Sequence, residues 1–168
     1  DLGDGAKSKD VTVLQKEIAH FHNESHGGFV RFGIGPDDKD SNVNLASASQ
    51  GGVGLPNRDY RFKDDAKSQE ARQKYSEFMT KMMVLAGDIP ENAAAATKTV
   101  MVIQKRFASA AKAPVDLRDS EANYNKKSLT ELAQMAPNVS WTEYLKTRGP
   151  SSVRAANVGT RKDFARID

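Results

Sequence analysis

Residues 49–60, SQGGVGLPNRDY, restrict the fold of this chain more than any other stretch. Gly51, Gly52 and Gly54 permit backbone angles that other residues avoid, while Pro56 fixes its own φ and has no amide donor. Leu55, directly before the proline, is pushed towards an extended conformation. A regular helix is therefore excluded here, and we expect a shaped turn with Leu55 facing inward. This turn should fix the residues that follow it, Arg58, Asp59 and Tyr60.

Composition sets broad limits on what the chain can be. Its 168 residues are enough for one domain with a buried core. Hydrophobic residues make up 38% and charged residues 28%, which is polar but not typical of a disordered chain. A net charge of only +3 argues against a dedicated nucleic-acid-binding protein. The absence of cysteine excludes disulfides and thiolate metal sites, and no apolar run approaches the roughly 20 residues of a membrane-spanning helix.

The apolar spacing predicts a mainly α-helical chain. A first helix is expected from about Asp10, as N-cap, to the glycines at 27–28. Two longer helices are expected at 65–86 and 90–111, and their short link predicts antiparallel packing. In the first of this pair, the apolar positions predict one buried stripe, formed by Ala71, Tyr75, Phe78, Met82 and Leu85.

Non-helical structure is expected in one small ribbon and at the ends. Alternating residues predict a two-stranded ribbon of 29–34 with 42–48, joined by the turn-forming run 36–40. The aspartates of that run lack the ordered ligand set of a calcium loop, so we interpret them as turn formers and caps. Ser128 with Glu131, and Ser140 with Glu143, form capping-box patterns for two short helices. Residues 1–9 are predicted to be a disordered tail and 149–168 a basic, partly ordered tail.

Three separated motifs give the chain a family resemblance. The run QGGVGLPNRDY at 50–60 resembles the QGGLGLPDRDYY signature of the neprilysin-like zinc metallopeptidases. Upstream, FGIGPDDKDSN at 32–42 is similar to an aromatic-Gly-x-Gly-x-D-x-K-D/N-S segment of that family. Downstream, RDSEANYNKKSLTEL at 118–132 is similar to another, and Trp141, Tyr144 and Leu145 follow in a W-x-x-Y-L spacing. Their shared order over roughly 10–148 is far more specific than any one motif.

The resemblance implies a non-catalytic part of such an enzyme. The zinc-binding HExxH of these peptidases does not occur in the sequence. Residues 10–148 would then be part of the amino-terminal helical lid domain, which restricts the access of peptides to the active site, and 149–168 would lead into further chain. Zinc would belong to the parent enzyme, with no cofactor in this chain. The partners implied are the catalytic domain of the same parent chain and, in the parent, peptide substrates, in a periplasmic or extracellular location.

The histidines suggest a metal site, but we do not predict one. His22 and His26 are four residues apart, a spacing that suits zinc on a helix, and Glu17 lies within reach of His20. However, Glu24 does not directly follow a histidine as the general base of HExxH does. We therefore expect a solvated or partly packed helix end here, with no catalytic and no metal-binding residues in the chain.

The residues that carry the resemblance are expected to have structural roles. Polar side chains in these motifs should form networks that hold non-helical chain in place, with Arg58 and Asp59 bonding to the backbone of the turn. The full set is Gly51, Gly52, Gly54, Leu55, Pro56, Arg58, Asp59, Tyr60, Arg118, Tyr124, Asn125 and Trp141.

Two other classes of function remain open from the sequence. One is a stand-alone helical protein-interaction domain without enzymatic activity. The other is a weak nucleic-acid binder that uses the basic tail, whose Arg154, Arg161, Lys162 and Arg166 are equally well explained as solvated charges. A gene that continues into an HExxH motif would favour the peptidase hypothesis over both.

Overall fold

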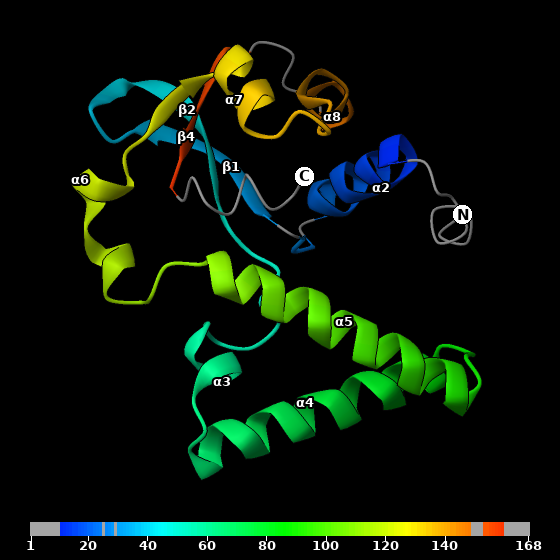
Figure 1. The fold of residues 1–168 in the computed structure, drawn as a ribbon. Helices are drawn as coiled ribbons and strands as arrows, with labels where there is room; N and C mark the ends of the chain where they lie inside the picture. The colour runs from blue at the N-terminus through cyan, green and yellow to red at the C-terminus, as the bar shows by residue number, and fades with distance from the viewer. Residues whose placement is uncertain (1–10, 25, 29, 149–152, 160–168) are drawn as a thin grey trace. The chain divides into compact units, whose positions relative to one another are not determined.

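The computed structural model describes residues 11–24, 26–28, 30–148 and 153–159 (Figure 1). The chain divides into two compact units, which are described separately below. Unit 1 combines residues 1–51 with 117–168, and unit 2 is formed by residues 52–116. The predictions of a disordered tail at 1–9 and of Asp10 as a helix cap lie outside the described residues.

Unit 1 is built on a four-stranded mixed sheet. Its strands are β1 (Val30–Asp37), β2 (Asp40–Gln50), β3 (Lys126–Ser128) and β4 (Ala155–Val158), in the order β1-β2-β4-β3. β1 and β2 form an antiparallel hairpin, β2 and β4 pair in parallel, and β3 is antiparallel to β4. β2 therefore lies inside the sheet, between its hairpin partner β1 and strand β4 from the other end of the chain.

This sheet overturns the predicted fold class. The ribbon predicted at 29–34 with 42–48 is present as the β1–β2 hairpin, but a mainly α domain with only two strands is wrong. The missed strands β3 and β4 have three and four residues, too few to show an alternating pattern. β4 also lies inside 149–168, which the sequence presents only as a basic tail of small residues.

Helices α2 (Val11–Asn23), α7 (Leu129–Met135) and α8 (Trp141–Arg148) pack with the sheet around one core (Figure 1). The predicted capping box of α7 is confirmed, because Ser128 and Glu131 each bond to the other's backbone amide. The strands contribute mostly small side chains to this core, which lets the larger helical side chains approach closely. The buried core residues include Ala19, Ala46, Ala48, Leu132, Trp141, Tyr144, Leu145, Ala156 and Val158.

A buried histidine joins α2 to α8. His22 Nδ1 lies 2.7 Å from the hydroxyl oxygen of Tyr144, and the His22 side chain is buried. Its Nε2 has no hydrogen-bond partner among the described residues, and a Cβ at Gly28 would lie only 2.6 Å from it. Burial, together with the Arg148 cation, lowers the pKa of His22, and burial raises the pKa of Tyr144 to about 12. Both effects favour the neutral form of His22 in the folded protein.

The pKa of His22 predicts an acid-sensitive packing of α2. A lowered folded-state pKa means that the unfolded chain binds the proton more readily, so stability is lost as pH falls below 6.5, the ordinary value. The urea midpoint of the wild-type chain should therefore decline between about pH 7 and pH 5. His22→Gln, which keeps a polar partner for Tyr144, should flatten that decline, whereas His20→Gln at the exposed His20 should not. An unchanged pH dependence in His22→Gln would contradict this role.

Unit 2 is a helical hairpin with a short helix at its start. It contains α3 (Asp59–Phe62), α4 (Ala66–Leu85) and α5 (Pro90–Ala110), in good agreement with the helices predicted at 65–86 and 90–111. Asp65 caps α4 by accepting a hydrogen bond from the Ser68 amide at 2.9 Å. Hydrogen bonds of Thr80 with Thr97 and of Gln104 with Tyr75 show that α4 and α5 run antiparallel, as predicted.

The predicted buried stripe of α4 is partly wrong. Phe78, Met82 and Leu85 are 58%, 49% and 71% exposed, whereas Ala71 and Tyr75 are partly buried. Tyr75 faces α5, in agreement with the prediction, but its neighbours there are Thr80 and Met83. Periodicity correctly identifies an apolar face of a helix, but it does not show what covers that face.

Candidate functional site

The glycine-rich stretch forms an irregular corner where the chain enters unit 2. Gly52 and Gly54 have φ of 68° and 72°, left-handed values that favour glycine. No regular helix or strand forms between Gln50 and Asp59, as the sequence predicts. Leu55 is partly buried. A shaped corner therefore replaces continuous secondary structure at this point of the chain.

A buried arginine holds the corner. The side chain of Arg61 is only 4% exposed, and its Nε and Nη2 donate to the Val53 carbonyl oxygen at 3.2 and 2.8 Å. Nη2 also donates to Gln104 Oε1, and Nη1 donates to Met101 Sδ at 3.0 Å. The guanidinium lies 5.4 Å from the centre of the Tyr75 ring. Arg61 thus connects the corner to both long helices.

The predicted residues that follow the corner contact α3, its C-terminal end and α4. Arg58 lies over the Phe62 ring at 5.4 Å, and the Asp59 carboxylate pairs with Lys63 at 3.3 Å. The Tyr60 carbonyl oxygen accepts a hydrogen bond from Arg72 at 2.7 Å. Sequence reasoning missed Arg61, since nothing in the one-dimensional pattern separates a buried arginine from the solvated ones beside it.

The side-chain space around Gly54 leads to a matched pair of variants. A Cβ at Gly54 would meet the Tyr75 hydroxyl and the Gln104 amide, whereas a Cβ at Gly87, which also has positive φ, meets nothing within 4 Å. Gly87→Ala should therefore cost only the backbone strain, about 1–2 kcal/mol of unfolding free energy. Gly54→Ala should cost more, because it also displaces Arg61's partners. Chemical denaturation measures both; equal losses would show that contact at Gly54 does not matter.

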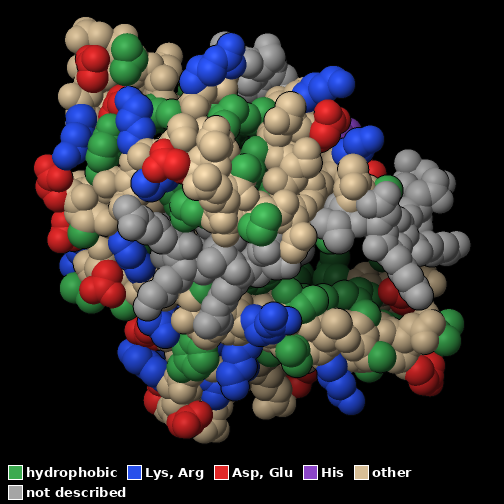
Figure 2. All heavy atoms as spheres, turned by 45° about the horizontal axis from the view of Figure 1, so that its top comes forward, with side chains coloured by type: hydrophobic (Ala, Val, Ile, Leu, Met, Phe, Trp, Pro, Cys, Tyr) green, Lys and Arg blue, Asp and Glu red, His purple; other side chains and the backbone are tan. Residues whose placement is uncertain are grey.

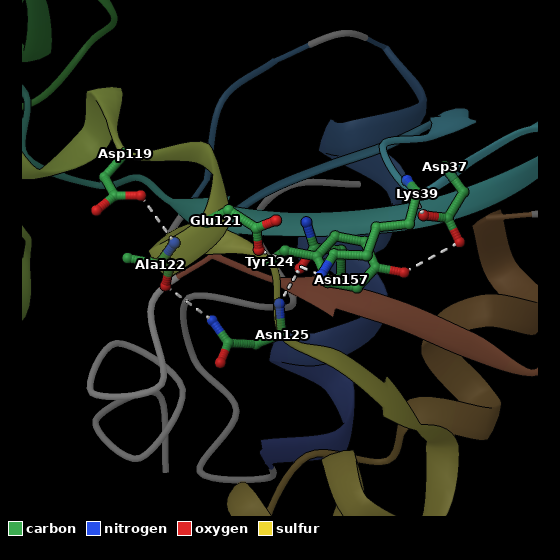
Figure 3. A network of polar contacts seen from close by, with 8 residues as sticks. All are labelled: Asp37, Lys39, Asp119, Glu121, Ala122, Tyr124, Asn125 and Asn157. Carbon is green, nitrogen blue, oxygen red and sulfur yellow. Dashed lines mark hydrogen bonds and ion pairs between the residues drawn. The ribbon is translucent and has the colours of Figure 1, made fainter.

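A second polar network surrounds Asp37 at the tip of the β1–β2 hairpin (Figure 3). The buried carboxylate of Asp37 accepts hydrogen bonds from Lys126 Nζ at 2.8 Å, the Tyr124 hydroxyl at 3.2 Å and the Lys39 amide at 3.0 Å. Lys39 Nζ lies 4.8 Å from the Tyr124 ring centre and 3.2 Å from a Glu121 carboxylate oxygen. The network therefore joins residues that are almost ninety positions apart in sequence.

The segment after Tyr124 extends this network to β4. The Asn125 amide donates to Asn157 Oδ1 at 2.7 Å, and the Asn125 carbonyl oxygen accepts from the Val158 amide at 3.0 Å. The Asn125 side chain also donates to the Ala122 carbonyl oxygen at 3.3 Å. The remaining predicted residues lie elsewhere: Arg118 is exposed at the end of η1 (Asp116–Arg118), and Trp141 is buried in the core.

The donors around Asp37 determine how stability depends on acid. The hydrogen bonds from Lys126, then from the Lys39 amide, lower the pKa of Asp37 to about 2, from 3.8. The ionised Asp37 therefore contributes its full stability at pH values above 3.8, the pKa in the unfolded chain. This contribution is lost as pH falls towards about 2, the pKa in the folded chain.

Asp37→Asn should lower the melting temperature at neutral pH, because Lys126 loses its buried anionic partner. The difference in melting temperature between Asp37→Asn and wild type should narrow as pH falls from 3.8, the ordinary aspartate pKa, towards about 2. The control is Asp38→Asn at the exposed neighbouring residue, which should melt like wild type. A difference in melting temperature that stays the same at every pH would contradict the ionised state assigned to Asp37.

The histidines do not assemble a metal site in the described part of the chain. His20 Nε2 and His26 Nδ1 lie 3.3 and 3.8 Å from Glu24 carboxylate oxygens, with all three side chains exposed, and His22 faces Tyr144 instead. No group of three or more His, Cys, Asp or Glu side chains is placed to hold a metal within the described ranges. These residues therefore do not fit a zinc ion.

On the face shown in Figure 2, Lys and Arg side chains are interspersed with Asp and Glu. Within the described segments, no helix has the length and apolar character needed to span a bilayer.

Comparison with known proteins identifies the family. The family model described as peptidase family M13, which represents the amino-terminal part of these enzymes, matches residues 1–165. The chain belongs to peptidase family M13. It is 30% identical over 129 residues to an endothelin-converting enzyme homolog of Locusta migratoria, covering 76% of this chain and 18% of the relative. Neprilysin-3 of Drosophila melanogaster is 33% identical over 111 residues, covering 66% and 14%. The M13 chain thus spans less than a fifth of the length of these curated relatives.

Solved structures show the same fold. Mycobacterium tuberculosis zinc metalloprotease Zmp1, in complex with an inhibitor, matches 99% of the M13 chain with a TM-score of 0.89 and 21% identity, and the match covers 25% of that protein. PepO from Lactobacillus rhamnosis HN001 matches 95% of the chain with a TM-score of 0.78 and 14% identity, again covering 25%. The family match and the identity to neprilysin-3 confirm the resemblance to neprilysin-like zinc metallopeptidases noted in the sequence.

Proposed function

We propose that this M13 chain is the non-catalytic amino-terminal part of a neprilysin-like zinc metalloendopeptidase. The observation that carries the proposal is the match of residues 1–165 to the family, combined with the absence of HExxH from the sequence. Zinc would be held by another part of the parent polypeptide, and the residues described here do not fit that ion. The parent would act on peptides outside the cell or in the periplasm.

Within the parent, this part would serve as a lid that limits access to the active site by size. Such a role requires stable walls rather than reactive groups, because a peptide is admitted or excluded by the shape of the opening. The two units offer such walls: a sheet covered by helices in unit 1, and a helical hairpin in unit 2. The catalytic domain of the same parent chain and the peptide substrates would be its partners.

The motif residues would keep the non-helical parts of these walls in place. Gly52 and Gly54 allow the sharp corner, and Arg61 holds the corner by bonding to the Val53 carbonyl. Tyr124 and Asn125 connect the hairpin tip and β4 to the segment between them. The proposed role explains why polar residues are found in the motifs without forming a reactive centre: they satisfy backbone groups and charges that irregular chain would leave unpaired.

Peptidase assays of the chain alone and of the parent protein test this proposal. The chain alone should not hydrolyse a quenched fluorescent peptide and should bind no stoichiometric zinc, whereas the parent should hydrolyse the peptide and lose activity with a chelator. The control is a parent variant with glutamine in place of the glutamate of its HExxH, which should be inactive but folded. Chelator-sensitive hydrolysis by the chain alone would overturn the non-catalytic assignment.

The lid role needs a separate measurement. Parent variants that loosen the corner, such as Gly54→Ala, should cleave larger unfolded polypeptides more readily relative to a short peptide. The assay is run at a temperature where both proteins are folded. If Gly54→Ala and wild type then show the same ratio of long-substrate to short-peptide cleavage, this part does not select substrates by size. A stand-alone interaction domain, the alternative, would be favoured if the gene ends near Asp168 without an HExxH.

A further inference from the structure

An apolar flank runs along the outer side of the α4–α5 hairpin. On α4, Phe78, Met82 and Leu85 recur at intervals of four and three residues, so they share one side of the helix. They are 58%, 49% and 71% exposed. This side differs from the row that faces α5, which contains Tyr75, Thr80 and Met83. Three large apolar side chains are thus left outside the contact between the helices.

α5 adds a matching row. Val100, Ile103 and Phe107 recur at intervals of three and four residues, and Ile103 is 39% exposed while the other two are partly buried. They lie to one side of Thr97 and Gln104, which face α4. When each helix is viewed along its axis from its N-terminus, its apolar row is reached by turning in the same direction from the residues that face the partner helix. Because both helices are right-handed and run antiparallel, the two rows lie on the same side of the hairpin.

These six positions, which we call the hairpin flank, are all large apolar residues, and the exposed Lys81 lies beside them on the same side of α4. Scattered exposed apolar residues are normal, but three large ones along one side of α4, continued on α5 by the exposed Ile103, are typical of a surface that another element covers. A row of large apolar side chains is also a poor match for a transient partner, since transient interfaces are about as polar as ordinary protein surface. A permanent apolar contact suits it better, of the kind made by a third helix packed along a helical pair.

The length of the relatives indicates where such a helix would come from. The fold of this chain accounts for 25% of the Zmp1 and PepO chains that it matches, so most of those polypeptides lies outside the shared part. We propose that the hairpin flank is the packing surface for an amphipathic helix from the part of the parent polypeptide beyond residues 1–168. The inference rests on the proposed function, because it requires that parent.

Cysteine labelling tests the inference, since the chain contains no cysteine of its own. Phe78→Cys and Leu85→Cys are made in the chain alone and in a parent whose own cysteines are replaced by serine. Gln73→Cys, at an exposed position on another side of α4, is the control. A maleimide reagent should label all three sites quickly in the chain alone. In the folded parent, labelling at 78 and 85 should slow by at least about tenfold, while labelling at 73 stays fast.

The outcomes separate the inference from the proposed function. Equal labelling of Leu85→Cys in the chain and in an active parent would overturn the inference and leave the peptidase assignment intact. Protection in the chain alone that increases with protein concentration would also overturn it, because a second copy would then be the occupant. A parent without chelator-sensitive peptidase activity would overturn the proposed function, whatever the labelling. Circular dichroism and thermal melting establish that each cysteine variant remains folded.

Discussion

The parallel pairing of β2 with β4 is the contact on which unit 1 depends. It places Ala46 opposite Ala156 and Ala48 opposite Val158, and so joins two segments that are more than one hundred residues apart. All four side chains are buried, and three of them are alanines that let α2, α7 and α8 approach the sheet closely. Without this pairing the β1–β2 hairpin would be an isolated ribbon, which is only marginally stable in water. In the sequence, unit 2 lies between the two segments that this pairing joins.

Two buried charges stabilise the irregular parts of the chain. Arg61 uses its planar set of donors to hold the Val53 carbonyl and to contact both long helices. Asp37 does the converse at the hairpin tip, where one carboxylate accepts from Tyr124, Lys126 and a backbone amide. In both cases a charged group is removed from water and given several hydrogen-bond partners, which is the condition under which burial of charge is tolerated. Exposed ion pairs such as Lys74 with Glu70 contribute far less.

The sequence predicted the local structure well and the long-range structure poorly. The corner at Gly52 and Gly54, the ends of α4 and α5 and the capping box of Ser128 follow from local rules, and all are present. β3 and β4 were missed because short strands exist only through their partners, and those lie far away in sequence. The same limit applies to the candidate site: Tyr124 and Asn125 could be singled out by their motif, but the bond from Tyr124 to Asp37 and the burial of Arg61 arise only in three dimensions. The exposure of Phe78, Met82 and Leu85 shows that an apolar face can be predicted without its covering element.

Amide hydrogen exchange of the chain tests the central claim most directly, namely that distant segments form one sheet. The amide of Val158 donates to the Asn125 carbonyl oxygen, and the amide of Gly159 donates to the Ala48 carbonyl oxygen. The account predicts that both amides exchange as slowly as those in the middle of β2, because the strands open together. Exchange of both at the rate of an unfolded peptide, while β1 and β2 remain protected, would contradict the four-stranded sheet and leave only the hairpin.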